Sequence, residues 1–284
     1  MLANYNSPGL FERCISFIDT VFPGCKELAY KGMNYNASWA KASTPFITEQ
    51  NNEIVAHLGL IPLDLIVEGE KRRVAAFHGI CVKPECRGKG IFKSLMSEAL
   101  EYSKQEFDSI LLFTDIPDLY KPFNFRVLPE SNFVIKLSHK GANNGALKKL
   151  SMDSSEDLAL INDILESRKP VSRKFDVRND VLFKLNTLDS SLYYAKDLEA
   201  IMIYSLDKET LVFENILSAK EHSLQDILNV IPENFSEVIL QFCPDMYPDY
   251  EFEAVPAQHE GFAMVSEGFD FNEKAFRYPN QYHC

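Results

Sequence analysis

The chain has 284 residues, of which 46% are hydrophobic and 25% charged, and this balance excludes collagen-like, low-complexity and wholly disordered proteins. Its formal net charge of −12 excludes a nucleic-acid partner bound through a broad basic surface. The length predicts about two domains of ~150 residues each.

Several features of the sequence bear on where the protein works. No apolar stretch reaches the roughly 18 residues of a membrane helix, because the run from Leu58 to Val67 contains Pro62 and Asp64. The first residues lack the basic start and the long apolar core of a secretory signal. The six cysteines are scattered without a C-x-x-C pair, so we expect reduced thiols and no bound metal. These features predict a cytoplasmic protein with no membrane partner.

The first half has a mixed α/β pattern. Apolar residues at helical spacing predict a helix over residues 8–21, and the spacing becomes helical again from Gly90 to about Lys104. Between these helices, apolar runs separated by turn-like segments predict antiparallel strands. The strands expected in this half are 45–48, 53–61, 63–67, 74–82, 109–114 and 132–137, with a short helix at 117–123.

A second domain is expected after residue 140. Residues 1–140 contain 16 basic and 16 acidic residues, so the remainder carries the whole net charge of −12. We therefore predict a domain of residues 1–140, a linker at 141–150 and an α+β domain of residues 151–284. The order of expected elements repeats that of the first half, which suggests a duplication. The expected elements are helices at 155–167, 176–185 and 223–230 and strands at 191–195, 200–204, 211–215 and 237–242.

The loop between Ile80 and Phe92 is the most specific chemical signal. A strand runs into a short turn with two glycines, Gly88 and Gly90, and a helix begins directly afterwards. Glycines at φ > 0 let successive backbone N–H groups point into one concavity, and the first turn of a helix adds unpaired N–H groups. Phosphate or pyrophosphate is the natural ligand of such a site. The Walker A and G-x-G-x-x-G patterns are absent, which disfavours ATP and dinucleotides.

The residues from Val82 to Ile91, V-K-P-E-C-R-G-K-G-I, resemble the acyl-CoA pyrophosphate loop of the GNAT superfamily of N-acetyltransferases. The consensus of that loop is [QR]-x-x-G-x-[GA]. Arg87 matches its first position and Gly90 its central glycine, whereas Phe92 stands where the family usually has glycine or alanine. A bulky side chain there must point away from the phosphates.

A second segment, Tyr120 to Arg126, is similar to the family's Y-x-x-x-G-F-[RK] motif. Asn124 replaces the usual glycine, and asparagine tolerates the left-handed conformation better than other non-glycine residues. The resemblance covers about residues 40–137. It implies a mixed, mostly antiparallel GNAT-type sheet flanked by helices.

The resemblance also implies a cofactor and its contacts. The cofactor is acetyl-CoA, and its pyrophosphate lies against the backbone of Arg87, Gly88, Lys89, Gly90, Ile91 and Phe92. The preceding strand, with Ile80, Cys81 and Val82, lies against the pantetheine and the acyl group. The family's usual acid for the leaving thiolate maps onto Tyr120, and a phenol with a pKa of about 10 is a suitable donor.

The general base is less clear from the sequence. Many relatives have a glutamate six residues before the valine of the loop, where this chain has Ala76. His78 lies on the same strand face, because side chains alternate with period two, and we take it as a candidate catalytic or substrate-contacting group. Deprotonation through water by Glu53 or Asp115 is the alternative.

The second half has no counterpart of the glycine loop, so we interpret it as a degenerate GNAT-like unit. The final Tyr-His-Cys segment is expected to be a frayed tail, and the alternative is that its free carboxylate reaches the active cleft. The sequence therefore predicts an N-acetyltransferase that transfers an acetyl group directly from acetyl-CoA to a primary amine of a small molecule. A protein lysine or N-terminal acetyltransferase and a non-catalytic acyl-CoA-binding module are the alternatives. The oligomeric state is left open, with a dimer as one option.

Overall fold

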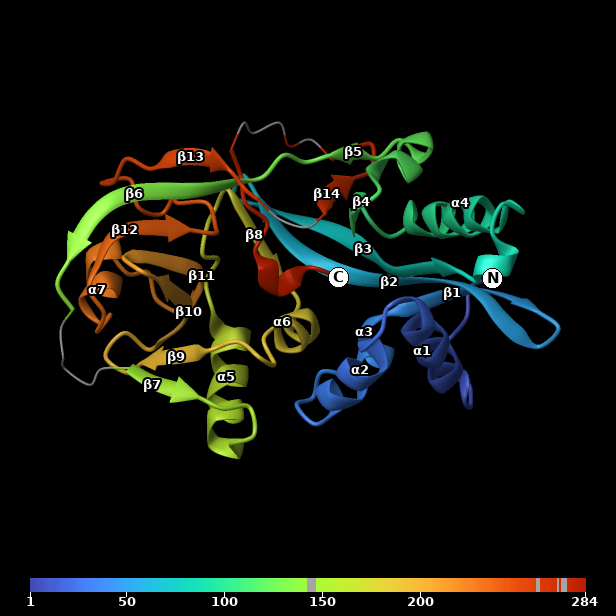
Figure 1. The fold of residues 1–284 in the computed structure, drawn as a ribbon, viewed down its shortest axis with the longest axis horizontal. Coiled ribbons are helices and arrows are strands. Elements are labelled where there is room, and N and C mark those ends of the chain that lie inside the picture. The colour runs from blue at the N-terminus through green and yellow to red at the C-terminus, as the bar shows by residue number, and fades with distance from the viewer. Residues whose placement is uncertain (142–146, 259–260, 270, 272–274) are drawn as a thin grey trace.

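The computed structural model describes residues 1–141, 147–258, 261–269, 271 and 275–284. In this part of the chain two seven-stranded sheets lie beside each other, with helices packed on them (Figure 1). The mixed α/β class expected from the sequence is confirmed. The expected linker at residues 141–150 is described only in part: residues 142–146 lie outside the described residues, and Leu147–Leu150 forms strand β7.

The first sheet has the strand order β1-β2-β3-β4-β14-β5, and β8 pairs with the C-terminal end of β2. The pairs β1–β2 and β2–β3 are antiparallel, whereas β3 and β4 are parallel and are joined through helix α4. The strands are β1 (Thr44–Gln50), β2 (Glu53–Val67), β3 (Glu70–Val82), β4 (Ser109–Thr114), β5 (Arg126–Val127), β8 (Phe175–Arg178) and β14 (Phe262–Val265).

Helices cover both faces of this sheet. Helix α4 (Ile91–Ser103) lies on one face, and α1 (Leu10–Val21), α2 (Cys25–Met33) and α3 (Trp39–Ala42) lie on the other (Figure 1). Neighbouring residues of β1 illustrate the alternation: Phe46 belongs to the core under α4, and Ile47 to the core under α1. Because both faces are covered, the strands read as long apolar runs.

The second sheet repeats the strand path of the first. The antiparallel strands β9, β10 and β11 are followed by helix α7 and by β12, which is parallel to β11. Its order is β13-β6-β12-β11-β10-β9-β7. The remaining elements are β6 (Ser131–His139), α5 (Ser155–Ser167), α6 (Asp180–Asn186), β9 (Leu192–Ala195), β10 (Ala200–Asp207), β11 (Thr210–Ser218), α7 (Leu224–Asn229), β12 (Phe235–Leu240) and β13 (Glu253–Pro256).

Two strands lie in the sheet of the opposite half of the sequence. The strand expected at residues 132–137 exists as β6, but it pairs with β12 and β13 of the second sheet. The late strand β14 is inserted between β4 and β5 of the first sheet. One continuous buried core accordingly includes Ile61 and Leu111 of the first sheet together with Phe213 and Val238 of the second.

The expected break between strands 53–61 and 63–67 is wrong, because β2 continues through Pro62. Proline has no N–H, so it is tolerated only where no strand partner needs one. The pairing of β1 ends at Leu60 and that of β8 begins at Asp64, so Pro62 lies opposite the gap between them. Its carbonyl points into this gap and accepts a hydrogen bond from Asn179 Nδ2 over 2.9 Å.

The helix expected at residues 176–185 is half wrong. Phe175–Arg178 is strand β8, and the helix begins only at Asp180. The side chain of Asn179 accepts a hydrogen bond from the Leu182 N–H and so caps the helix start. Residues 175–178 form a strand because they pair with β2, and the spacing of apolar residues within the segment does not reveal such a tertiary contact.

Among the described residues, no helix is long and apolar enough to cross a membrane.

Candidate active site

The segment between β3 and α4 is a tight glycine-containing loop. A 3₁₀ turn at Pro84–Cys86 is followed by Arg87, whose Nε donates to the Val82 carbonyl over 3.1 Å. Gly88 and Gly90 have φ values of 73° and 80°, in the left-handed region that glycine occupies without strain. A Cβ on either glycine would meet no described atom within 4 Å, so the space above the backbone is open.

Helix α4 begins directly at this open space. Ser94 donates the first intrahelical hydrogen bond, to the Gly90 carbonyl (3.0 Å), so the N–H groups of Ile91, Phe92 and Lys93 precede the helical ladder. No side chain among the described residues caps Gly90. The loop and the 13-residue helix therefore form a concave surface of backbone donors at the positive end of a helix dipole, which suits a phosphate or diphosphate.

Strands β3 and β4 separate next to this loop. Their parallel pairing ends at Phe77 opposite Leu112, and beyond it β3 pairs only with β2 among the described strands. A bulge accompanies the separation, since the β2–β3 register shifts between His57 and Gly59, and Gly79 has a φ of 55°. The wedge between the two strands opens into a cavity.

This cavity has a volume of about 840 Å³. That lies within the range of about 300–1,000 Å³ that is typical of ligand pockets. It is bounded by the glycine loop and α4 on one side and by α1, α2 and α3 on the other. Its described lining residues are Ile18, Val21, Phe22, Cys25, Trp39, Phe77, His78, Gly79, Ile80, Cys81, Val82, Cys86, Arg87, Gly88, Gly90, Ile91, Phe92, Lys93, Phe113, Thr114, Asp115, Ile116, Leu119, Tyr120 and Cys284.

Most residues singled out from the sequence meet at this cavity. The exception is Lys89, which is exposed and is not among the described lining residues. Of the two carboxylates considered as bases, Asp115 lines the cavity. Glu53 does not: it is exposed and forms an ion pair with Lys83 (2.8 Å).

Tyr120 is buried at the cavity wall. The segment expected as a helix at 117–123 consists of two 3₁₀ turns, and Tyr120 lies between them. Its ring meets that of Phe92 edge-on with centroids 5.8 Å apart, so Phe92 packs against the tyrosine. Burial raises the pKa of Tyr120 to about 12, so the phenol stays protonated at neutral pH. Asn124 has a φ of 62°, the left-handed conformation expected for it.

His78 is buried at the opposite wall of the cavity. Its Nε2 is 2.7 Å from Ser43 Oγ, and its ring lies 4.9 Å from that of Trp39. Burial, followed by the proximity of His57, lowers the pKa of His78 to about 3. A neutral imidazole with so low a pKa is a weak base.

The sequence did not reveal the cavity wall formed by α1 and Trp39, and it favoured a frayed tail over the alternative that the last residues reach the cleft. The tail expected to be frayed is buried instead: Tyr278 and Tyr282 have exposed fractions of 0% and 1%, and Cys284 lines the cavity. The high density of aromatic residues in this tail was the signal in the sequence that could have predicted its burial. In Figure 1 the C-terminus lies between the two halves, beside α6.

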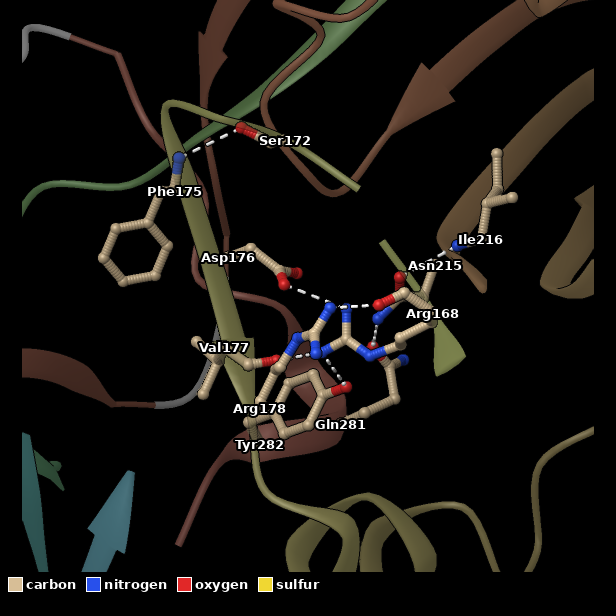
Figure 2. Close-up of polar contacts among 10 residues, drawn as sticks. All are labelled: Arg168, Ser172, Phe175, Asp176, Val177, Arg178, Asn215, Ile216, Gln281 and Tyr282. Carbon is tan, nitrogen blue, oxygen red and sulfur yellow. Dashed lines mark hydrogen bonds and ion pairs between the residues drawn. The ribbon is translucent and has the colours of Figure 1, made fainter. Parts of the chain in front are cut away.

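A buried polar network holds this tail (Figure 2). The Arg168 guanidinium donates to Asp176 Oδ2 (2.9 Å), to the Val177 carbonyl and to the Tyr282 hydroxyl (3.0 Å). Nearby, Asn215 donates its amide to Gln281 Oε1 over 3.1 Å. Arg168 and Asp176 have side-chain exposures of 1% and 0%. Because water cannot solvate either charge, each one offsets the cost of burying the other. The network connects β8, β11 and the C-terminal segment.

Comparison with known families agrees with this geometry. Residues 6–128 match the family model of an acetyltransferase (GNAT) domain, and this range contains the loop, α4 and Tyr120. Residues 6–128 therefore carry the GNAT acetyltransferase domain to which the loop and Tyr120 belong.

Solved structures share the fold across most of the chain. The probable N-acyltransferase from Enterococcus faecalis has a TM-score of 0.62 at 13% identity, covering 93% of this chain and 71% of that chain. Eis1 from Mycobacterium abscessus has a TM-score of 0.60 at 13% identity, with coverages of 94% and 72%. The GCN5-related N-acetyltransferase from Kribbella flavida has a TM-score of 0.55 at 15% identity, with coverages of 93% and 70%. At these identities the likeness concerns the fold alone. No curated protein sequence matches the chain.

Proposed function

We propose that this protein is an acetyl-CoA-dependent N-acetyltransferase that transfers the acetyl group directly to a primary amine of a small molecule. The observation that carries the proposal is the single cavity that is lined by the glycine loop and Tyr120 and also by residues of α1, α2 and α3. Because α1, α2, α3 and the C-terminal segment also line this cavity, a small amine suits it better than the surface of a folded protein. We propose a cytoplasmic location, supported by six free cysteines.

The chain's own groups fit acetyl-CoA. The N–H groups from Gly88 to Lys93 would hold the diphosphate, with the cations of Arg87 and Lys93 beside it. The backbone of Ile80–Val82 would line the pantetheine, since this part of β3 has no partner on the β4 side among the described strands. Bound acetyl-CoA supplies an acetyl thioester, which is activated toward amines.

The transfer needs two proton movements. A bond forms between the amine nitrogen and the acetyl carbonyl carbon, and the carbon–sulfur bond breaks. One proton leaves the nitrogen, and the sulfur gains one. We assign the second proton to the Tyr120 hydroxyl, because burial keeps this group protonated. We assign removal of the first proton, the one on the amine nitrogen, to the Asp115 carboxylate, which accepts it directly or through a water molecule. We give His78 a substrate-contacting role as a neutral imidazole.

Two measurements on the full chain test this function. Acetyl-CoA is expected to raise the thermal unfolding temperature, since a ligand that binds only the folded state stabilises it. Release of free CoA thiol is then followed with small primary amines, a lysine-containing peptide and a peptide with a free N-terminus. Faster release with small amines supports the proposal. Release only with a peptide indicates a protein acetyltransferase, and stabilisation without any release indicates a binding module.

A further inference from the structure

The second sheet contains the same local opening as the first. The parallel pairing of β11 and β12 ends at Phe213 opposite Leu240, just as that of β3 and β4 ends at Phe77 opposite Leu112. A bulge follows directly, since Glu214 on β11 is one residue more than the register with β10 accommodates. We call the opening between the ends of β11 and β12 the second wedge.

The C-terminal segment bridges the two strands of the second wedge. Gln281 Nε2 donates to Glu214 Oε2 at the bulge, and Asn215 Nδ2 donates to Gln281 Oε1, each over 3.1 Å (Figure 2 shows the contact with Asn215). From the other strand, Gln241 Oε1, directly after β12, accepts a hydrogen bond from Asn280 Nδ2 over 3.0 Å. Gln281 and Asn215 have exposed fractions of 2% and 0%, so water cannot replace these contacts.

The loop beside the second wedge lacks the features of the glycine loop. Residues 219–222, between β11 and α7, contain no glycine, and none of them has a positive φ. Helix α7 has six residues, against thirteen in α4. The two charged residues of the loop are paired: Lys220 contacts Glu199 over 2.8 Å, and Glu221 contacts Lys169 over 3.4 Å. This loop is therefore a poor diphosphate site.

The segment held at the second wedge continues directly into the wall of the main cavity. Asn186 Nδ2 donates to the backbone carbonyls of Gln281 (3.1 Å) and His283 (2.6 Å). The His283 ring is stacked on that of Phe113, with centroids 4.2 Å apart, and Phe113 lines the main cavity. Cys284 lines the main cavity and also a smaller one of about 310 Å³. A displacement of Gln281 would therefore displace part of the cavity wall.

We propose that the second sheet binds the chain's own C-terminal segment at the place where the first sheet would bind acetyl-CoA, and that Gln281 is thereby a positioning residue for the cavity wall. The second half then contributes to the reaction without a cofactor site of its own. Phe113 and Cys284 are not among the groups that would hold the diphosphate. Release of Gln281 should therefore weaken amine binding and spare acetyl-CoA binding. The part of this inference that concerns turnover rests on the function proposed above.

The first experiment exchanges the two hydrogen-bonding groups at the bulge. In Gln281→Glu a buried carboxylate faces that of Glu214, and at pH 8.5 their repulsion should drive the segment from the second wedge. In the double variant Glu214→Gln with Gln281→Glu, a donor meets an acceptor again. Release is followed by iodoacetamide alkylation of Cys284, quantified in the tryptic peptide that begins at Tyr278. Burial raises the pKa of this thiol to about 12, so it reacts slowly in the parent.

We expect alkylation of Cys284 to be at least tenfold faster in Gln281→Glu than in the parent, and within twofold of the parent in the double variant. Glu214→Gln alone is the matched control, because it keeps an oxygen that accepts from Gln281. If Gln281→Glu does not fold, Gln281→Met, which has a similar length and no amide, replaces it with the same expected rise. Unchanged alkylation in the single variant, or a double variant as reactive as the single one, overturns the inference.

The second experiment separates the cavity wall from the cofactor site. Calorimetric titration of the parent should give one acetyl-CoA per chain, and Gln281→Glu should keep the acetyl-CoA thermal shift. Thiol release is measured with the small amine that reacts fastest in the parent: its KM should rise at least fivefold in Gln281→Glu, with the KM for acetyl-CoA within twofold. Two acetyl-CoA sites per chain, or an equal rise in both KM values, overturns the inference. No release with any amine overturns the proposed function, and alkylation of Cys284 still decides the inference.

Discussion

Three properties of Tyr120 bear on the proton-donor role proposed for it. It is buried with an exposed fraction of 6%, its ring is fixed against Phe92 and Phe125, and its pKa is raised to about 12. The raised pKa keeps the proton on the oxygen throughout the neutral range. It also makes transfer to a thiolate less favourable than from an ordinary phenol, so the proposed role depends on the position of the hydroxyl rather than on its acidity.

Replacing Tyr120 by phenylalanine removes the hydroxyl and keeps the ring. We expect kcat to fall about a hundredfold, which is the usual scale for a lost general acid. The acetyl-CoA thermal shift should be unchanged, since the diphosphate cradle is built from other residues. Tyr102→Phe, a change of the same kind on α4 outside the cavity lining, is the control. Equal kcat for Tyr120→Phe and the parent would remove the acid role.

The two buried histidines predict how stability depends on pH. Burial lowers the pKa of His57 to about 4 and that of His78 to about 3, whereas both are near 6.5 in the unfolded chain. Below pH 6.5 the unfolded state therefore binds protons that the folded state does not. The stabilising contribution is complete above pH 6.5 and is lost as the pH falls toward 4 and 3, by about 1 kcal/mol per pH unit for each histidine.

Denaturant unfolding between pH 7 and pH 4.5 measures this effect. His57→Gln should be less stable at pH 7, because the Tyr5 hydroxyl and the Gly79 carbonyl lose their partner. Its free energy of unfolding should nevertheless fall less steeply with decreasing pH than that of the parent. His222→Gln, at a half-exposed position, is the control. Parallel pH profiles for His57→Gln and the parent would contradict the assignment.

The functional residues differ in how far the sequence could reveal them. Gly88, Gly90 and Tyr120 occur in local motifs, because one loop and one turn place them. The cavity wall formed by α1 and α3 is different: Trp39 and Ile18 are ordinary core-type residues, and only the packing of α1–α3 on the sheet makes them line the cavity. The lowered pKa of His78 is likewise a property of its burial and not of its position in a strand.

At the level of elements, the β3–loop–α4 unit depends on the backbone conformation of Gly90. Valine at this position would have to adopt a φ near 80°, which costs on the order of 1–3 kcal/mol. Its Cβ would also enter the open space above the loop. We expect Gly90→Val to abolish the acetyl-CoA thermal shift.

A matched control separates strain from loss of the site. Gly69, in the turn between β2 and β3, has a φ of 79°, and a Cβ there would likewise meet no described atom within 4 Å. Gly69→Val should therefore lose similar stability and retain the thermal shift. A retained shift in Gly90→Val, or a lost shift in both variants, would mean that the loop does not hold the cofactor.

Helices and strands with their own local signal were predicted well. The sequence placed α1, α4 and α5 within two residues of their ends, since each has apolar spacing and a glycine or serine before its first turn. It missed β8, β13 and β14, which are four residues long and exist only through their partners. Short strands carry too few side chains for period two to stand out.

At the level of the molecule, the exchange of β6 and β14 makes the two halves depend on each other. A fragment of residues 1–140 would lack β8 and β14, which exposes the edges of β2 and β4 and buried residues such as Leu111. We expect this fragment to aggregate or to remain unfolded, with no acetyl-CoA thermal shift.

The fragment experiment also tests the domain boundary predicted at residue 140. Circular dichroism and acetyl-CoA titration of the fragment are compared with those of the full chain. A folded, monomeric fragment that binds acetyl-CoA would support an independent domain. The duplicated strand order could be predicted from the sequence, because the expected helices and strands recur in the same order in both halves. The exchange of β6 and β14 could not be predicted, since strand pairing across more than a hundred residues leaves no local signature.

The position of β14 also sets the time at which this protein can become active during its synthesis. The glycine loop and Tyr120 leave the ribosome early, but the strand that completes their sheet is Phe262–Val265. At the usual ~5–20 residues per second, translation of the intervening segment takes on the order of ten seconds. During that interval β4 has no β14 to pair with, so its edge stays open until the C-terminal part of the chain has been made.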